Sequence, residues 1–273
     1  MFLLDSPERR YELKTYMMQT IIPNPSVAFS NLLRADFITQ WRNRRSVLMS
    51  LLVPLIILIS WKGIIDKVGG AFALSMSLTI GLTSIGIMGY AISIARDRDK
   101  GVFQRLRVTP LPTYFIMLSR LCVQLVMILL LTACVFIVGY KYDHIILPAS
   151  GYAITFITAL IGGALYLGLG QMIVGLVKNA ETVNSTSRLV YIALIMLGMF
   201  GELSRFGELG MFGKQLQTMV VWSPFGTVKT ILASGMQLST WNSDTSMALL
   251  VTFGYAILFS FLGIKWFRWN SAV

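Results

Sequence analysis

Residues 114–140 read YFIMLSRLCVQLVMILLLTACVFIVGY, a run in which Arg120 is the one charged side chain. A helix of about 20 apolar residues crosses the roughly 30 Å hydrocarbon core of a bilayer, so this run is long enough to span it. The whole chain shares this character, because 55% of its 273 residues are hydrophobic, 13% are charged and its mean hydropathy is +0.70. A water-soluble domain needs far more charge to cover its surface. The sequence therefore predicts an integral membrane protein.

Further apolar runs predict an all-α membrane protein with six transmembrane helices. The fifth run has only twelve clearly apolar residues, Leu189 to Phe200, so this span must include polar residues from Thr182 onward or line a wet cavity there. We expect residues 1–45 to form a cytoplasmic lead and residues 46–273 to form the transmembrane domain. The predicted spans are residues 46–61, 70–95, 114–140, 152–177, 182–200 and 247–264.

The segment before the first span combines apolar and basic side chains at helical spacing. Residues 26–45 read SVAFSNLLRADFITQWRNRR, and Phe29, Leu33, Phe37 and Trp41 recur every four residues. This pattern is typical of an amphipathic helix that lies in the inner membrane interface. The alternative is that the segment forms the cytoplasmic start of the first span.

Basic residues are distributed unevenly over the predicted topology. If both ends of the chain are cytoplasmic, 17 of the 23 lysine and arginine residues lie on the inner side and six lie on the outer side. Cytoplasmic segments of membrane proteins carry the excess of basic residues, so the sequence favours this orientation in the cytoplasmic membrane. The net charge of +11 is then mostly a topology signal, and we expect no nucleic-acid partner.

The predicted spans lack the groups that drive ion-coupled transport or catalysis. No Asp or Glu stands in the middle of any span, whereas proton- or sodium-coupled transporters usually need an ionisable group at that depth. The sequence has no phosphate-binding G-x-x-x-x-G-K-[ST] motif and no metal-ligand cluster, and its single histidine, His144, lies in a predicted outer loop. We expect no enzyme activity and no cofactor in this chain itself, so energy for uphill transport has to come from a separate subunit.

The loop after the second span is short, basic and amphipathic. It reads RDRDKGVFQRLRVTPLPT over residues 96–113, with Phe103 on an apolar side and Arg105 on a cationic side. Such a stub, held between two spans, is suited to docking in a groove of a cytoplasmic partner and passing on its motion. The alternative is a basic topology determinant without a partner. Arg120, about one turn inside the third span, either extends back to the interface or pairs with a loop carboxylate such as Asp97.

This loop resembles the coupling-helix segment of the ABC-2-type permease family, the membrane subunits of one class of ABC transporter. The family pattern is roughly acidic-Arg-acidic, Gly-Thr, Glu-x-Leu and Thr-Pro, and residues 96–111 here read RDRDKGVFQRLRVTPL. Asp replaces the usual Glu, and Gln104 stands where the family often has Glu. The resemblance implies that this helix docks on the ATPase subunit. The residues that it assigns to coupling are Arg96, Asp97, Arg98, Asp99, Gly101, Phe103, Arg105 and Leu106.

The resemblance extends over most of the chain. Residues 26–45 are similar to the family's N-terminal connecting helix, and the segment after the fifth span is similar to its outer re-entrant region. That region commonly ends in a Ser/Asn-Pro turn, which Ser223, Pro224 and Gly226 match here. The implied partners are two copies of a cytoplasmic ABC ATPase that carries ATP and Mg²⁺, a second permease copy or a sister permease, and membrane lipid.

Two spans carry candidate residues for a translocation pathway. Small and polar residues in the second span share one face, and Met and aromatic residues in the fifth span suit varied apolar ligands. Both patterns also occur in ordinary helix packing, but in related exporters spans 2 and 5 line the path at the dimer interface. The candidates are Thr79, Thr83, Gly86, Tyr90 and Ser93 in the second span, and Tyr191, Met196, Met199 and Phe200 in the fifth.

The leading hypothesis is the permease subunit of an ATP-driven exporter with a hydrophobic or amphipathic cargo, such as a drug, a lipid or a peptide-like molecule. One alternative is a polysaccharide-exporting permease of the same family, although residues 41–48, WRNRRSVL, fit the pattern of such proteins only in part. Another alternative is a membrane scaffold or sensor that docks a cytoplasmic partner without transport.

Overall fold

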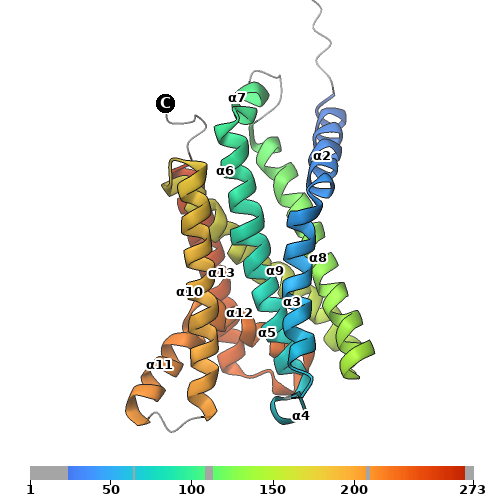
Figure 1. Cartoon of the computed structure of the whole chain (residues 1–273), viewed down its shortest axis with the longest axis vertical. Coiled ribbons are helices and arrows are strands. Elements are labelled where there is room, and N and C mark those ends of the chain that lie inside the picture. Colours follow the sequence, from blue (N-terminus) through green and yellow to red (C-terminus); the bar gives the residue numbers. More distant parts are fainter. Residues whose placement is uncertain (1–23, 64, 108–112, 207–209, 268–273) are drawn as a thin grey trace, which may run out of the picture.

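The computed structural model describes residues 24–63, 65–107, 113–206 and 210–267, so the predicted lead before residue 24 lies outside the described residues. Within these ranges the chain is helical and contains no strand. Most helices run side by side along the long axis of the molecule (Figure 1). The short helix α7 (Val102–Arg107) marks one end, which we name the α7 end, and α4 (Ile65–Val68) marks the opposite α4 end.

The other helices connect these two ends or cap them. Span 2 consists of three consecutive helical segments, of which the middle one, η1, is a π-helix. The bounds are α2 (Pro25–Arg42), α3 (Arg44–Ser60), α5 (Gly70–Thr83), η1 (Ser84–Ala91), α6 (Ile92–Asp99), α8 (Thr113–Asp143), α9 (Ala149–Leu176), α10 (Ala180–Phe206), α11 (Gly210–Trp222), α12 (Pro224–Met236), η2 (Leu238–Thr240, a 3₁₀ turn) and α13 (Ser243–Lys265).

Five helical stretches of the described chain are long and apolar enough to cross a membrane. A sixth is obtained if the pair Pro25–Arg42 and Val47–Ser60, which is bent by 59°, counts as one broken span. The predicted all-α, multi-pass membrane protein is therefore confirmed, with five or six candidate spans. The five are Gly70–Asp99, Tyr114–Asp143, Ala149–Leu176, Ala180–Gly201 and Ser243–Lys265.

The fifth predicted span is part of a longer helix than its apolar run indicates. α10 has 27 residues, which gives a length of about 40 Å at 1.5 Å per residue. Its first turns contain Glu181, Asn184 and Arg188, so the helix includes the polar residues that the sequence analysis assigned to it.

Span 2 is the buried centre of the bundle. In its most apolar window 89% of the residues are buried within the molecule, compared with 17% for α10 and 22% for α13. Leu78 and Ile85 of this span, and Tyr166 of α9 beside it, are almost completely buried. α10 and α13 consequently keep much of their surface for lipid or for another protein chain.

The π-helix η1 lies in direct backbone contact with α9. π-helical turns are rare and frequently occur at functional sites. At Gly86 a Cβ atom would lie 2.5 Å from the carbonyl carbon of Tyr166, so any larger residue would force the two helices apart. This close approach holds the middle of span 2 against α9.

α2 packs along α8 and leaves aromatic side chains on its outer side. The ring of Phe29 lies 5.1 Å from that of Phe115, and Asp36 is buried between the two helices. Phe37 and Trp41 are exposed and stack on each other at 5.7 Å. Amphipathic aromatic residues are enriched at membrane interfaces, so this arrangement suits the predicted interfacial helix, which stays a prediction.

Two short helices follow α10 near the α4 end. α11 and α12 have 13 residues each, about 20 Å, which is too short to cross a bilayer alone. Ser223 begins α12: its Oγ accepts the N–H of Gly226 at 3.1 Å and donates to the carbonyl of Val220 at 2.6 Å. Pro224 occupies the first helical position, where a missing N–H costs nothing. The predicted turn is thus a capped helix start, and its re-entrant position in a membrane stays a prediction.

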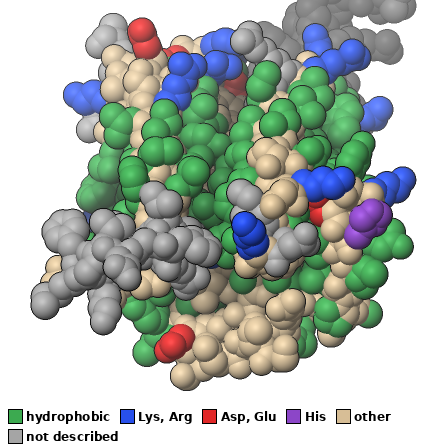
Figure 2. All heavy atoms as spheres, turned by 60° about the horizontal axis from the view of Figure 1, so that its bottom comes forward, with side chains coloured by type: hydrophobic (Ala, Val, Ile, Leu, Met, Phe, Trp, Pro, Cys, Tyr) green, Lys and Arg blue, Asp and Glu red, His purple; other side chains and the backbone are tan. Residues whose placement is uncertain are grey.

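Charged residues are unequally distributed between the two ends. Figure 2 shows Lys and Arg side chains along the upper edge, others beside the histidine nearer the α4 end, and many hydrophobic side chains between them. Hydrophobic side chains in this position are what a lipid-facing surface requires.

Candidate functional site

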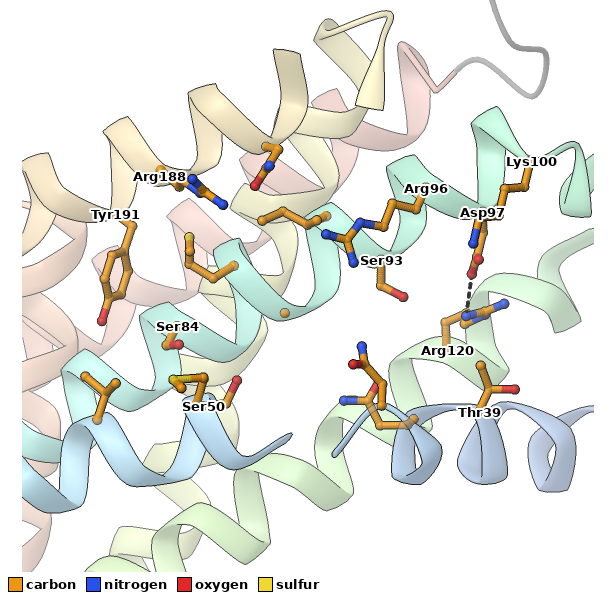
Figure 3. A pocket seen from close by; sticks show the side chains of 18 residues that line it. Thr39, Ser50, Ser84, Ser93, Arg96, Asp97, Lys100, Arg120, Arg188 and Tyr191 are labelled. Carbon is orange, nitrogen blue, oxygen red and sulfur yellow. Dashed lines mark ion pairs between the residues drawn. The ribbon is translucent and has the colours of Figure 1, made fainter. Parts of the chain in front are cut away.

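A cavity of about 730 Å³ lies between α3, η1, α6 and α10 towards the α7 end, with α2 and α8 closing one side (Figure 3). Small-molecule sites usually have volumes of about 300–1,000 Å³. The cavity is lined by Thr39, Gln40, Asn43, Met49, Ser50, Val53, Ser84, Met88, Gly89, Ile92, Ser93, Arg96, Asp97, Lys100, Arg120, Asn184, Arg188 and Tyr191.

The lining changes from charged to apolar with depth. On the wall formed by span 2, the order from the α7 end inward is Arg96, Ile92 and Met88, over about 12 Å at 1.5 Å per residue. α10 has the same order, since Arg188 lies nearer to its start than Tyr191. The cavity therefore has a cationic mouth and a mostly apolar interior.

The positive charges at the mouth fall into two groups. Asp97 is the only carboxylate among the lining residues, and it pairs with Arg120 at 2.7 Å. Arg120 also pairs with Asp36 of α2 at 3.1 Å, so the pairing alternative that the sequence left open for this residue is the one observed. The side chains of Arg96 and Arg188 make no ion pair or hydrogen bond within the described part of the chain. They extend from facing helices into the same space (Figure 3).

The predicted pathway stripe of span 2, apart from Ser93, does not line this cavity. Thr79 and Thr83 are fully buried, and each hydroxyl donates to the carbonyl four residues earlier at 2.7 Å. Gly86 packs on α9, and the hydroxyl of Tyr90 donates to Oε1 of Gln171 on α9 at 2.7 Å. Gly86 and Tyr90 therefore hold span 2 to α9 in this structure, and the pathway role of all four residues stays a prediction.

The π-helix η1 explains why spacing alone did not identify the lining face. Ser93 continues the regular spacing of the stripe, yet it lines the cavity together with Met88 and Ile92. Hydrogen bonds in a π-helix join residue i to i+5, so each turn holds more residues and the faces of the span rotate across η1. The sequence signal for the lining face is the recurrence of Ser84, Met88, Ile92 and Arg96 every four residues.

The four candidates of the fifth span are divided between the cavity and the outer surface. Tyr191 lines the cavity. Met196, Met199 and Phe200 lie further along α10 with 43%, 46% and 56% of their surface exposed, so within this chain they face outward.

Arg98 and Asp99 join the end of span 2 to the turn between α9 and α10. The guanidinium of Arg98 is completely buried and donates to the carbonyls of Val174 at 2.8 Å and Val177 at 2.9 Å, with Lys178 as a third acceptor. These carbonyls end α9, where a cation is favoured by the helix dipole. The carboxylate of Asp99 accepts the N–H of Ala180, at the start of α10, at 2.8 Å. We name this pair the Arg98–Asp99 clamp.

The remaining coupling candidates form the start and the two sides of α7. Gly101 has a φ of 67°, a conformation that favours glycine, and it turns the chain from α6 into α7. Phe103 is completely buried, with its ring 5.9 Å from that of Phe267, and Leu106 is half-buried. Gln104 and Arg105 are exposed. The eight candidates are thus distributed over the cavity mouth, the clamp and α7, and only part of α7 is open to a partner.

The family model described as "ABC-2 type transporter" matches residues 27–225. The chain belongs to this family. The match begins in α2 and ends at the start of α12, so it includes the cavity, the clamp and α7. The chain is also similar to "Putative transport permease YvfS" of Bacillus subtilis (strain 168). The two are 24% identical over 230 residues, which cover 81% of this chain and 89% of that protein.

Proposed function

We propose that this chain is the transmembrane permease subunit of an ATP-driven exporter for a hydrophobic or amphipathic molecule, such as a drug, a lipid or a peptide-like molecule. It lies in the cytoplasmic membrane with both termini and α7 in the cytoplasm. The observation that carries the proposal is the position of the cavity: two of its walls, α6 and α10, are joined by the Arg98–Asp99 clamp directly beside α7.

The energy comes from two copies of a cytoplasmic ABC ATPase that hold ATP and Mg²⁺. The ATPase contacts the exposed side of α7, at Gln104 and Arg105, while Phe103 anchors the other side within the permease. A force on α7 reaches α6 through Gly101 and passes to α10 through the clamp. Because α3 is not part of the clamp, such a movement changes the distance between α3 and the α6–α10 wall, which opens or closes the cavity.

A second permease copy or a sister permease completes the pathway. α10 is only 17% buried in its most apolar window, and Met196, Met199 and Phe200 lie exposed on it. Flexible Met and aromatic side chains suit both a packed helix interface and the passage of varied apolar molecules. The rest of the apolar surface contacts membrane lipid.

The cavity favours an amphipathic cargo over a polysaccharide. Its deeper part is lined mainly by apolar side chains, and the only side-chain hydrogen-bonding groups there are three hydroxyls. The apolar residues are Met49, Val53 and Met88, and the hydroxyls belong to Ser50, Ser84 and Tyr191. A sugar chain has many hydroxyl groups, and these three partners would leave most of them unpaired in that part of the cavity, which is costly.

The test is reconstitution of the permease with an ABC ATPase encoded beside it in lipid vesicles, followed by ATPase assays over amphipathic compounds. Met88→Trp fills the cavity and should reduce substrate-stimulated ATPase activity on the order of tenfold, the equivalent of about 1.4 kcal/mol. Leu250→Trp, on an exposed position of α13, is the matched control and should leave stimulation unchanged. Failure of the ATPase to associate, or equal stimulation of the two variants, contradicts the proposal.

A further inference from the structure

The mouth of the cavity carries positive charge that this chain does not neutralise. Its lining holds four cationic side chains and one carboxylate, and that carboxylate is paired with Arg120. Arg120 has a second carboxylate, Asp36, so its own charge is fully balanced within the chain. Arg96 and Arg188 have no such partner among the described residues.

These two arginines are exposed side chains that line the cavity from two facing helices. Arg96 belongs to α6 and Arg188 to α10, and Figure 3 shows both side chains extending into the space between these helices. Two cationic side chains that extend into the same space repel each other. An anion between them would remove that repulsion, and guanidinium groups bind carboxylate and phosphate oxygens in pairs.

A third polar side chain lies near the two arginines at the mouth of the cavity. Asn184 lies one helical turn before Arg188 and lines the cavity. Its buried side-chain oxygen has no hydrogen-bond partner among the described residues. Buried polar atoms are normally paired. An amide oxygen accepts hydrogen bonds and does not bind an anion itself, so Asn184 contributes to an anion site by rotating its amide, which presents its N–H groups to the cavity as donors.

We propose that the cavity binds an amphipathic anion, with its carboxylate, phosphate or sulfate group between Arg96 and Arg188 and its apolar body against Met88 and Tyr191. The apolar part of the lining begins about one turn inward from Arg96, at Ile92. A ligand whose anionic head group is attached directly to an apolar chain therefore matches a lining that is cationic at the mouth and mainly apolar further in. The inference rests on the proposed transport role of the same cavity and names the charge of the cargo.

The experiment uses the full-length chain in phosphatidylcholine vesicles and a dodecanoic acid with a photoreactive diazirine in its chain. The methyl ester of the same compound is the uncharged match. After illumination, mass spectrometry measures labelling of the peptides that contain Met88 and Tyr191. We expect the acid to label them on the order of tenfold more than the ester, the ratio that one charge-assisted contact typically produces.

Variants test whether the arginines are responsible. The double variant Arg96→Gln/Arg188→Gln should reduce labelling by the acid to the level of the ester, whereas Arg96→Lys/Arg188→Lys should retain most of it. Lys141→Gln removes an exposed cation at the α4 end and should have no effect. Equal labelling by acid and ester in the native chain, or unchanged labelling of the Gln double variant, overturns the proposal.

Competition identifies the source of the anion. If phosphatidylglycerol added before illumination reduces labelling by the acid, the bound anion is a membrane lipid. If only dodecyl phosphate reduces the labelling, the bound anion is a single-chain molecule. Labelling needs neither nucleotide nor ATPase. The labelling result can therefore contradict the anion site even if the chain carries out ATP-coupled transport of a neutral cargo. Specific labelling by the acid can equally occur in a chain that associates with no ATPase, so the two proposals are tested separately.

Discussion

Arg98 shows how a residue in a recognisable motif can serve the fold. The loop sequence suggested a cation on a docking surface, but the guanidinium is buried against carbonyl groups 76 to 80 residues later in the chain. The end of α9 leaves backbone oxygens without helical partners, and these need donors once they are buried. No spacing within the loop reveals that contact.

Replacing Arg98 by Ala should destabilise the permease before it affects any partner. The carbonyls of Val174 and Val177 would lose their donor, which costs about 1–3 kcal/mol for a buried polar group. Thermal unfolding of the purified permease in detergent measures the effect, with Arg105→Ala as the exposed control from the same loop. If the two variants unfold at the same temperature as the native chain, the clamp does not support the fold.

Gly86 should tolerate no side chain, because η1 and α9 touch through their backbones there. Gly86→Ala places a Cβ within 2.5 Å of the backbone of Tyr166, and overpacking of this kind costs about 1–3 kcal/mol. Gly254→Ala, in α13, is the matched control, since a Cβ there meets nothing within 4 Å. The control should unfold at or above the native temperature, as Ala favours a helix over Gly. Equal losses in the two variants would show that close packing is not the cause.

At the scale of elements, α7 is a helix with one anchored and one open side. Phe103 packs against Phe267 beyond the end of α13, while Arg105 donates to the carbonyl of Lys100 and remains exposed. The amphipathic pattern of the loop predicted both sides. What the pattern could not show is that the apolar side is already occupied by this chain, which leaves the polar side for a partner.

Arg105→Glu should weaken association with the ATPase without unfolding the permease. Reversal of one charge at an interface changes affinity by several-fold to about a hundredfold, depending on how far the pair is desolvated. Co-purification and titration of the ATPase measure the change, and Lys265→Glu, exposed at the end of α13, provides the control. Undiminished binding of the Arg105→Glu variant would remove α7 from the docking surface.

At the scale of the whole molecule, the buried span 2 and the more exposed helix α10 make different kinds of contact. Span 2 is mostly buried, and its η1 segment presents one face to α9 and another to the cavity. α10 has a polar start beside the cavity mouth and an outward apolar surface nearer the α4 end. It is therefore the helix best placed to contact both the cargo and a second permease.

Cross-linking can locate the second permease. Met199→Cys on α10 should form a bis-maleimide cross-link between two permeases in vesicles, either between identical copies or to a sister chain. Leu258→Cys, similarly exposed on α13, should cross-link far less if α13 faces lipid. Cys122 and Cys134 are replaced by Ser in both variants so that only the new thiol reacts. More cross-linking through α13 than through α10 would reverse the proposed arrangement.

The sequence by itself determined the class of the protein, the approximate number of spans and the family resemblance. These follow from local properties, because the thickness of a bilayer sets the length of an apolar run and a motif is a short contiguous stretch. The polar start of α10 was also evident, since twelve apolar residues are too few to cross. The tertiary structure alone decided which side of span 2 lines the cavity and what Arg98 contacts. Both depend on a π-helix that rotates the faces of one span and on contacts between segments about 80 residues apart, which no local pattern contains.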